Sequence, residues 1–184
     1  MLQYIQNIDE KILLYVQDNI RTEAINRPML IFSLLGFCGL FWIIVSVVFI
    51  ANKEYRRTGF YVLITIALCW CLNDGLLKNL IARPRPYETI EALKLLINPP
   101  GSYSFPSGHA CIGFAASYVI TKLNGAKGVM YYIIAFFIAV SRVYVGAHYL
   151  TDVIAGALFG TLAAFFLFKL INYFEGKIKI KKKE

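Results

Sequence analysis

The stretch PMLIFSLLGFCGLFWIIVSVVFIAN, residues 28–52, contains no charged residue. A helix rises about 1.5 Å per residue, so this stretch is long enough to cross a hydrocarbon core of about 30 Å. Residues 58–73 and 153–168 are also uncharged. With 58% hydrophobic residues in 184 and a mean hydropathy of +0.59, the chain is more apolar than a soluble domain of this size. The sequence therefore predicts an all-α integral membrane protein.

The hydrophobic pattern predicts a bundle of five transmembrane helices and a separate N-terminal amphipathic helix. The expected spans are residues 28–52, 57–81, 107–123, 127–145 and 149–172. Before them, apolar residues recur at helical spacing opposite Asp9, Glu10, Asp18 and Arg21, which is typical of a helix lying on the membrane surface. We interpret residues 1–184 as a single domain: an interfacial helix at 1–26, a bundle at 28–172 and a basic cytoplasmic tail at 173–184.

The net charge of +8 could indicate a nucleic-acid-binding protein, but the distribution of the charge argues against one. Five of the lysines fall in the last eight positions: Lys177, Lys179, Lys181, Lys182 and Lys183. Such a tail after a membrane helix is typical of a cytoplasmic topology signal or a lipid-surface contact. We therefore expect the lipid bilayer, and no nucleic acid, as the partner.

Basic residues in the short connections predict the orientation of a multi-pass protein of the cell membrane. Lys53, Arg56 and Arg57 follow the first expected span, and Lys122 and Lys127 follow the third. With five spans, both connections and the C-terminus lie on one side, which the positive-inside rule makes cytoplasmic. Residues 82–105 and 146–149 then lie on the non-cytoplasmic side. Residues 88–97 in this outer region read as a short interfacial helix.

Three separated segments carry residues suited to binding a phosphate, and all three fall at the non-cytoplasmic face. They are KNLIARPRP (78–86), FPSGHA (105–110) and SRVYVGAHYLTD (141–152). Arg binds phosphate with a bidentate fork and Lys with a mobile charge. Ser107 is a candidate N-cap, and Gly108 would let backbone N–H groups approach an anion. His148 and Asp152 are four residues apart, so Asp152 could accept the Nδ1 proton of His148 and leave Nε2 free to attack.

The order and spacing of these residues resemble the type-2 phosphatidic acid phosphatase family. The matching positions are Lys78, Arg85 and Pro86; Pro106, Ser107, Gly108 and His109; and Ser141, Arg142, His148 and Asp152. The resemblance implies a six-helix bundle and hydrolysis without a metal or other cofactor. It implies that His148 is the nucleophile, that Asp152 orients it and that His109 protonates the leaving oxygen. It also implies that Lys78, Arg85, Ser107, Gly108 and Arg142 bind the phosphoryl group.

Physical arguments from the residues agree with these roles. A phosphoryl group in transfer spreads negative charge over its equatorial oxygens, which three cationic side chains and a helix N-terminus can stabilise. Asp74 precedes Lys78 by one turn, and we favour an ion pair between them over a catalytic role. For Arg83, a phosphate or headgroup contact and a simple interface anchor stay equally open. Gly156 and Gly160 favour a helix contact within the bundle over a dimer contact.

The leading hypothesis is an enzyme that hydrolyses a lipid phosphate or diphosphate ester at the outer membrane face. An outward site favours undecaprenyl diphosphate, with phosphatidylglycerophosphate or phosphatidate as the alternative. A membrane transporter or channel, in which Asp74, Lys78 and Arg142 line a pathway, is the non-enzyme alternative. A non-catalytic scaffold is disfavoured because His109, His148 and Asp152 would have no task. The oligomeric state stays open.

Overall fold

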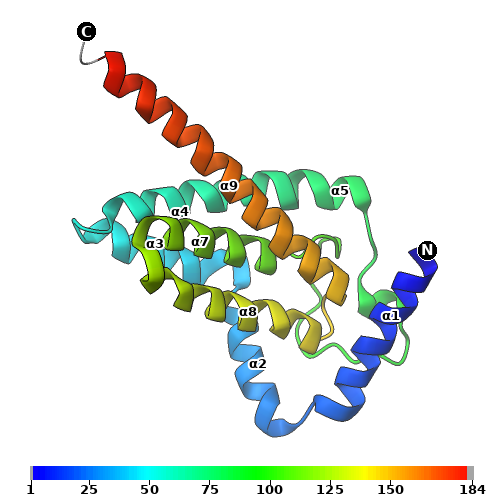
Figure 1. Ribbon diagram of the computed structural model, residues 1–184. Helices are drawn as coiled ribbons and strands as arrows, with labels where there is room; N and C mark the ends of the chain where they lie inside the picture. Colours follow the sequence, from blue (N-terminus) through cyan, green and yellow to red (C-terminus); the bar gives the residue numbers. More distant parts are fainter. Residues whose placement is uncertain (1, 182–184) are drawn as a thin grey trace.

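The computed structural model describes residues 2–181, and every regular element in this part of the chain is a helix (Figure 1). The all-α prediction is confirmed. The longer helices are α1 (Leu2–Tyr15), α2 (Glu23–Leu35), α3 (Leu40–Ala51), α4 (Arg56–Cys69), α7 (Gly108–Asn124), α8 (Val129–Tyr144) and α9 (Leu150–Lys181). A π-helical segment, η3 (Trp70–Leu77), joins α4 to α5 (Lys78–Ile81), so that residues 56–81 form one long helical run as expected.

Three helical runs are long and apolar enough to cross a membrane: Arg56–Thr89, Gly108–Tyr144 and Leu150–Phe174. The pair formed by α2 and α3 is a fourth candidate if the two are counted as one bent span. The run Gly108–Tyr144 contains two antiparallel helices, α7 and α8, which meet at the short segment η4 (Gly125–Gly128) (Figure 1). Among the described residues there are thus three to four candidate spans, and the five separate passes stay a prediction.

Helix α7 lies at the centre of the bundle and packs against α4, α8 and α9. The largest buried cluster takes residues from α3, α4, α7, α8 and α9, including Trp42, Val62, Ile112, Ile138 and Ala164. Two glycines of α9 permit its close approach to α7. A Cβ at Gly156 would lie 2.4 Å from the Ser107 carbonyl oxygen, and one at Gly160 would lie 2.1 Å from that of Cys111. Gly156 and Gly160 therefore mark a helix contact inside the bundle.

The expected continuous span at residues 28–52 is wrong, because the chain bends by 53° between α2 and α3. The break covers Gly36 and the 3-10 turn η2 (Phe37–Gly39), where Cys38 and Gly39 have positive φ angles of 48° and 70°. Such angles cannot continue a right-handed helix. The helix also begins earlier than residue 28. Helix α2 begins at Glu23, within the region assigned to the interfacial helix, because Thr22 caps it by accepting a bond from the Ile25 N–H.

Helix α1 is packed on the bundle. Leu13 is fully buried in a cluster with Ile90, Leu93 and Tyr149, and α1 contacts α9. A π-helical turn, η1 (Val16–Ile20), extends α1 toward α2. In Figure 1 the helix lies beside the green connection that follows α5 and beside the start of α9. The N-terminal segment is therefore placed at the end of the bundle where the predicted site residues meet.

The helix expected at residues 88–97 is wrong as well. A single helical turn, α6 (Pro86–Thr89), is followed by non-helical chain. Side chains of the N-terminal segment bind backbone groups here: Gln17 donates to the Ala92 carbonyl, and Arg21 donates to that of Lys94 at 2.5 Å. At the other end of the chain, α9 continues to Lys181, so the expected tail at 173–184 begins inside this helix. Lys182 and Lys183 lie outside the described residues.

Candidate active site

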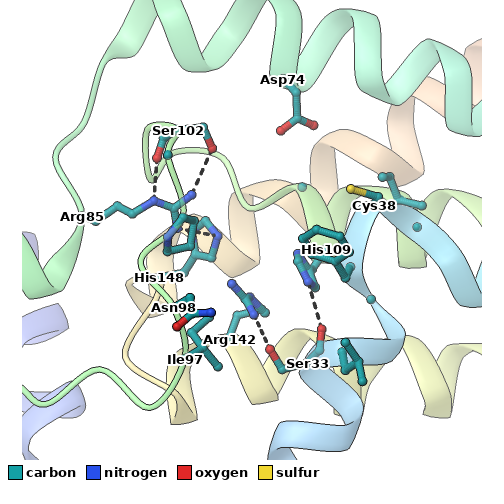
Figure 2. A pocket seen from close by; sticks show the side chains of 18 of the residues that line it. Ser33, Cys38, Asp74, Arg85, Ile97, Asn98, Ser102, His109, Arg142 and His148 are labelled. Carbon is teal, nitrogen blue, oxygen red and sulfur yellow. Dashed lines mark hydrogen bonds between the residues drawn. The ribbon is translucent and has the colours of Figure 1, made fainter.

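A cavity of about 950 Å³ opens between the α2–α3 bend and the ends of α5, α7 and α8 (Figure 2). Among the residues that line it are Lys78, Arg85, Gly108, His109, Arg142 and His148. The structure thus brings together side chains from all three segments that the sequence singled out. Ser107 and Asp152 are completely buried and lie behind the cavity wall.

His148 lies in the connection between α8 and α9, where the sharp turn at Gly146 (φ +81°) directs the chain back into the bundle. The imidazole is buried, and Figure 2 shows it beside the guanidinium of Arg85. The His148 Nε2 atom lies 3.4 Å from Arg85 Nη1. Because a guanidinium can only donate, this contact places the lone pair of the imidazole on Nε2 and its proton on Nδ1.

The Nδ1 atom of His148 faces Asp152 through an intervening serine. Asp152 Oδ2 is 3.6 Å from Nδ1, beyond an ordinary hydrogen bond, whereas Ser104 Oγ is 3.4 Å from Nδ1. Ser104 Oγ also donates to Asp152 Oδ2 at 2.5 Å. The direct bond expected between His148 and Asp152 is therefore replaced by a chain in which Ser104 accepts from the imidazole and donates to the carboxylate.

Burial, and after it the positive charges of Arg85, Arg142 and Lys78, holds the pKa of His148 well below its ordinary value. Removal from water disfavours the charged imidazolium, and the neighbouring cations disfavour it further. The imidazole is therefore neutral at pH 7. A neutral imidazole with an available Nε2 lone pair can act as a nucleophile or a base.

The three cationic side chains of the cavity are held mainly by neutral oxygen atoms. Arg85 donates to the carbonyls of Ser102 at 2.5 Å and Ala147 at 2.9 Å, and Arg142 donates to the hydroxyl of Ser33. Lys78 pairs with Asp74 at 2.5 Å, which confirms the predicted ion pair. Asp74 is the only acidic residue among those lining the cavity in the described chain. The cavity therefore carries an excess of positive charge and is suited to an anion.

His109 occupies the first turn of α7 and faces the end of α2. Its Nε2 atom lies 3.2 Å from the carbonyl oxygen of Ser33. Close packing by Gly36 fixes the ring, since a Cβ at this position would lie 2.4 Å from His109 Cδ2. The bend after α2 therefore brings Ser33 and Gly36 against two of the predicted site residues, His109 and Arg142.

Ser107 occupies the N-cap position of α7, but its hydroxyl makes no capping bond, so that part of the prediction is wrong. Its Oγ atom is buried and has no hydrogen-bond partner among the described residues. The backbone of Ser107 has a different role, because its N–H donates to the Asp152 carbonyl at 3.0 Å. This bond ties the start of α7 to the start of α9.

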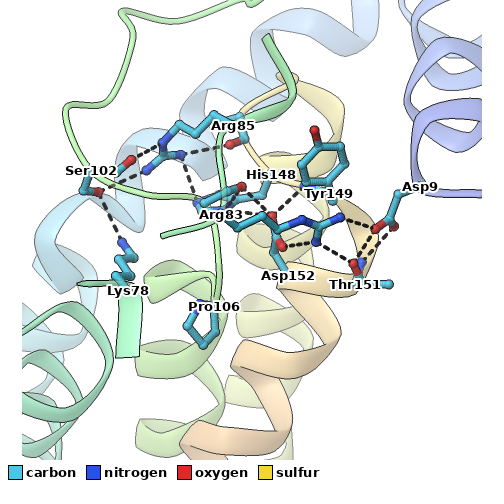
Figure 3. A network of polar contacts seen from close by, with 12 residues as sticks. Asp9, Lys78, Arg83, Arg85, Ser102, Pro106, His148, Tyr149, Thr151 and Asp152 are labelled. Carbon is cyan, nitrogen blue, oxygen red and sulfur yellow. Dashed lines mark hydrogen bonds and ion pairs between the residues drawn. The ribbon is translucent and has the colours of Figure 1, made fainter. Parts of the chain in front are cut away.

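Arg83 lies outside the lining of the cavity. It forms ion pairs with Asp152 at 2.5 Å and Asp9 at 2.9 Å, and its guanidinium carbon lies 3.9 Å from the centroid of the Tyr149 ring (Figure 3). These contacts support neither of the two roles considered for Arg83, a phosphate contact or an interface anchor. Its partners identify it as a structural support for Asp152.

Sequence reasoning missed Ser33, Ser102, Ser104 and Asp9. The three serines belong to no spacing pattern, and only the folded chain brings their hydroxyl groups to Arg142, Arg85 and His148. Asp9 carried one signal, because it is an acid at the edge of an apolar helix face. The sequence predicts Asp9 on the polar face of a helix at the membrane surface, whereas its side chain is only 1% exposed.

Comparison with known proteins places this site in a family. The family model described as the PAP2 superfamily matches residues 57–175. The chain is 31% identical over 162 residues to an undecaprenyl-diphosphatase of Sulfolobus acidocaldarius, covering 87% of this chain and 78% of the relative. It is 32% identical over 173 residues to phosphatidylglycerophosphatase B of Bacillus subtilis, covering 87% and 80%. The crystal structure of a transmembrane PAP2-type phosphatidylglycerolphosphate phosphatase from Bacillus subtilis superposes with a TM-score of 0.72 at 28% identity, covering 92% of this chain and 87% of that one.

The chain belongs to the PAP2 superfamily and is a multi-pass membrane enzyme, a lipid phosphate phosphatase. The resemblance drawn from the three sequence segments is thereby confirmed. The family membership favours a hydrolase over the transporter or channel alternative. Lipid phosphates are the class of substrate that the family implies.

Proposed function

We propose that this enzyme hydrolyses lipid phosphate or diphosphate esters through a phosphohistidine on His148, without a metal ion. The observation that carries the proposal is the placement of the imidazole. Its Nε2 atom faces the cationic cavity beside Arg85, and its Nδ1 atom faces Ser104 and Asp152. This is the arrangement of an activated nucleophile: an attacking atom directed at the substrate, with its other side oriented by a third group.

In the first step, the Nε2 lone pair forms a bond to phosphorus while the bond from phosphorus to the leaving oxygen breaks. His109 donates a proton to that oxygen. In the second step, water attacks the phosphohistidine, releases inorganic phosphate and restores the imidazole, and a proton returns to His109. Lys78, Arg85 and Arg142 neutralise the charge on the equatorial oxygens, together with backbone N–H groups at Ser107 and Gly108. Asp152 keeps His148 in its tautomer.

We further propose undecaprenyl diphosphate as the preferred substrate. The cavity combines three cations, enough to bind a diphosphate, with apolar side chains from the α2–α3 region, among them Leu30, Leu34 and Phe37. The similarity to an undecaprenyl-diphosphatase supports this choice. Phosphatidylglycerophosphate is the second candidate, supported by the comparable similarity to phosphatidylglycerophosphatase B. Both are lipids with a phosphoric ester at the headgroup, so the same catalytic residues would serve either one.

Phosphate release from a panel of lipids tests the activity and the substrate together. We expect undecaprenyl diphosphate to give the highest kcat/KM, ahead of phosphatidylglycerophosphate, phosphatidate and diacylglycerol diphosphate. EDTA should leave the rate unchanged. His148→Ala should lower phosphate release by at least about 10³-fold and abolish acid-labile phosphoprotein, because the attacking atom is lost.

Ser117→Ala is a suitable control for that variant, since Ser117 is buried and donates only to the Gly113 carbonyl within α7. A phosphoprotein that persists in His148→Ala would refute the nucleophile. Strong inhibition by EDTA that a divalent metal reverses would refute the metal-free mechanism.

We also propose that the cavity faces the non-cytoplasmic side and that the C-terminus is cytoplasmic. The α3–α4 connection and the η4 turn, which carry the basic residues, lie together at the end of the bundle away from α1 (Figure 1). In a background in which Cys38 and Cys71 are replaced by serine, a cysteine at exposed Lys94 should react with an impermeant maleimide from outside whole cells. A cysteine at exposed Arg56 should react only after lysis. The opposite labelling pattern would place the site in the cytoplasm.

A further inference from the structure

The N-terminal helix α1 carries a charged residue that its surface position does not explain. Asp9 is 1% exposed, although residues on either side of it in the same helix, such as Ile8 and Lys11, are exposed. Its Oδ1 atom accepts a bond from the Thr151 N–H at 3.1 Å, and its Oδ2 atom accepts from the Thr151 hydroxyl and from Arg83 Nη2 at 2.9 Å. A buried carboxylate is stable only when it is paired and hydrogen-bonded in this way. The helix is therefore tied by its one buried acid to the first turn of α9.

Arg83 links this acid to the active site. Its Nη1 atom donates to Asp152 Oδ1 at 2.5 Å and to the Thr151 hydroxyl at 2.8 Å. Its Nη2 atom donates to Asp9 and to Gln6 Oε1 at 2.6 Å, so both terminal nitrogens of the guanidinium are engaged (Figure 3). The face of the group stacks on the Tyr149 ring. Arg83 thus bridges α1 and the carboxylate next to the proposed nucleophile.

The two oxygens of Asp152 have different partners. Oδ1 binds Arg83, whereas Oδ2 accepts from Ser104 Oγ and from the Tyr149 N–H at 3.0 Å. Each contact restricts rotation of the carboxylate. The Ser104 hydroxyl, held by this carboxylate, in turn contacts the Nδ1 atom of His148 and so fixes the orientation of the imidazole. An unbroken chain of polar contacts therefore leads from α1 to the imidazole.

We propose that Asp9 is a positioning residue for the phosphatase reaction: through Arg83 it orients Asp152 and thereby His148. Helix α1 would then contribute to catalysis. This inference rests on the proposed role of His148 as nucleophile. Asp9 carries one negative charge, Arg83 one positive and Asp152 one negative, so Asp9 prevents Arg83 from fully neutralising Asp152. Loss of Asp9 removes one of the two carboxylates that pair with Arg83, so the guanidinium is then paired with Asp152 alone and loses its ionic tie to α1. Asp9 lies outside residues 57–175, the part of the chain that the family model matches.

The test is the kinetics of Asp9→Asn in the purified full-length protein. The amide keeps the shape of the side chain but removes its charge and turns a donor toward either Arg83 or Thr151. We expect kcat to fall about tenfold, as for other groups that orient a reacting residue, with KM changed less than twofold. The rate of phosphohistidine formation in a single turnover should fall by the same factor. Asp9→Glu, which keeps the charge, should recover part of kcat.

Asp18→Asn is the matched control, because Asp18 is an exposed acid on the same N-terminal helical segment. Rates are normalised to the folded protein in each preparation, measured by size exclusion and thermal unfolding, so that loss of folding is separated from loss of rate. An Asp9→Asn enzyme with wild-type kcat per folded molecule would overturn the inference. So would a fall of equal size in Asp18→Asn. Failure of the wild-type enzyme to form a phosphohistidine would instead refute the proposed function.

Discussion

The two sides of His148 differ in how their charges are satisfied. On the cavity side, the guanidinium groups of Arg85 and Arg142 contact only neutral groups of the described chain, and Arg142 Nε has no partner there; Lys78 alone pairs with a carboxylate, that of Asp74. On the opposite side, Asp152, Arg83 and Asp9 are joined in ion pairs between 2.5 and 2.9 Å. The cavity side therefore has an excess of positive charge, which suits it to bind an anion, whereas the paired charges on the opposite side hold their groups in place.

The difference explains why similar residues have different tasks. Arg83 and Arg85 are two positions apart and chemically identical, yet only Arg85 lines the cavity. The side chain of Arg83 is directed to α1 and α9, where it pairs with the carboxylates of Asp9 and Asp152. The identity of a basic residue near the site therefore does not decide its role. For these two arginines the difference is that Arg83 is held by two carboxylates outside the cavity, whereas the Arg85 guanidinium lines the cavity beside His148.

Arg142→Gln should produce the larger effect, because it removes charge from the side that receives the substrate. We expect kcat/KM to fall about 10²- to 10³-fold, or roughly 3 kcal/mol of transition-state stabilisation, as for the loss of one preorganised donor to a developing anion. The measurement is steady-state phosphate release per folded enzyme. Arg142→Lys should recover only part of the loss, since an ammonium cannot reproduce the fork of a guanidinium.

Arg56→Gln is the control for charge removal alone, because Arg56 is exposed and donates only to the Ile50 carbonyl at the other end of the bundle. Its kcat/KM should stay within twofold of the wild-type value. A decrease of less than tenfold in Arg142→Gln would contradict the assignment of the cavity side to phosphate binding.

Three short segments with definite spacing supply all three cationic side chains that line the cavity, so the sequence could single these residues out. It did not predict the opposite side, because the partners there are far apart along the chain. Asp9 and Thr151 are 142 positions apart, and Ser104 and Asp152 are 48 apart. No local pattern connects such pairs. Only the docking of α1 and of the loop before α7 brings them together.

The fold shows the same limit. Apolar length was sufficient to find α4, α7, α8 and α9, because burial in lipid and in the core both favour long apolar helices. It could not find the bend between α2 and α3, since Gly36 and Gly39 are compatible with either a straight or a broken helix. At residues 90–97, Ile90, Leu93, Leu96 and Ile97 recur at helical spacing. The chain is held in another shape because Gln17 and Arg21 bind its backbone groups.

Ser104→Ala should produce the smaller effect and tests the side that holds His148 in place. The variant removes the hydroxyl between His148 and Asp152 without changing any charge. A buried hydrogen bond of this kind contributes about 1 kcal/mol, so we expect kcat to fall roughly five- to tenfold with KM nearly unchanged. Ser117→Ala, which removes a buried hydroxyl from the middle of α7, should leave kcat unchanged. If Ser104→Ala instead raises KM at constant kcat, Ser104 contacts the substrate. Ser104 would then belong to the cavity side of His148 and not to the opposite side.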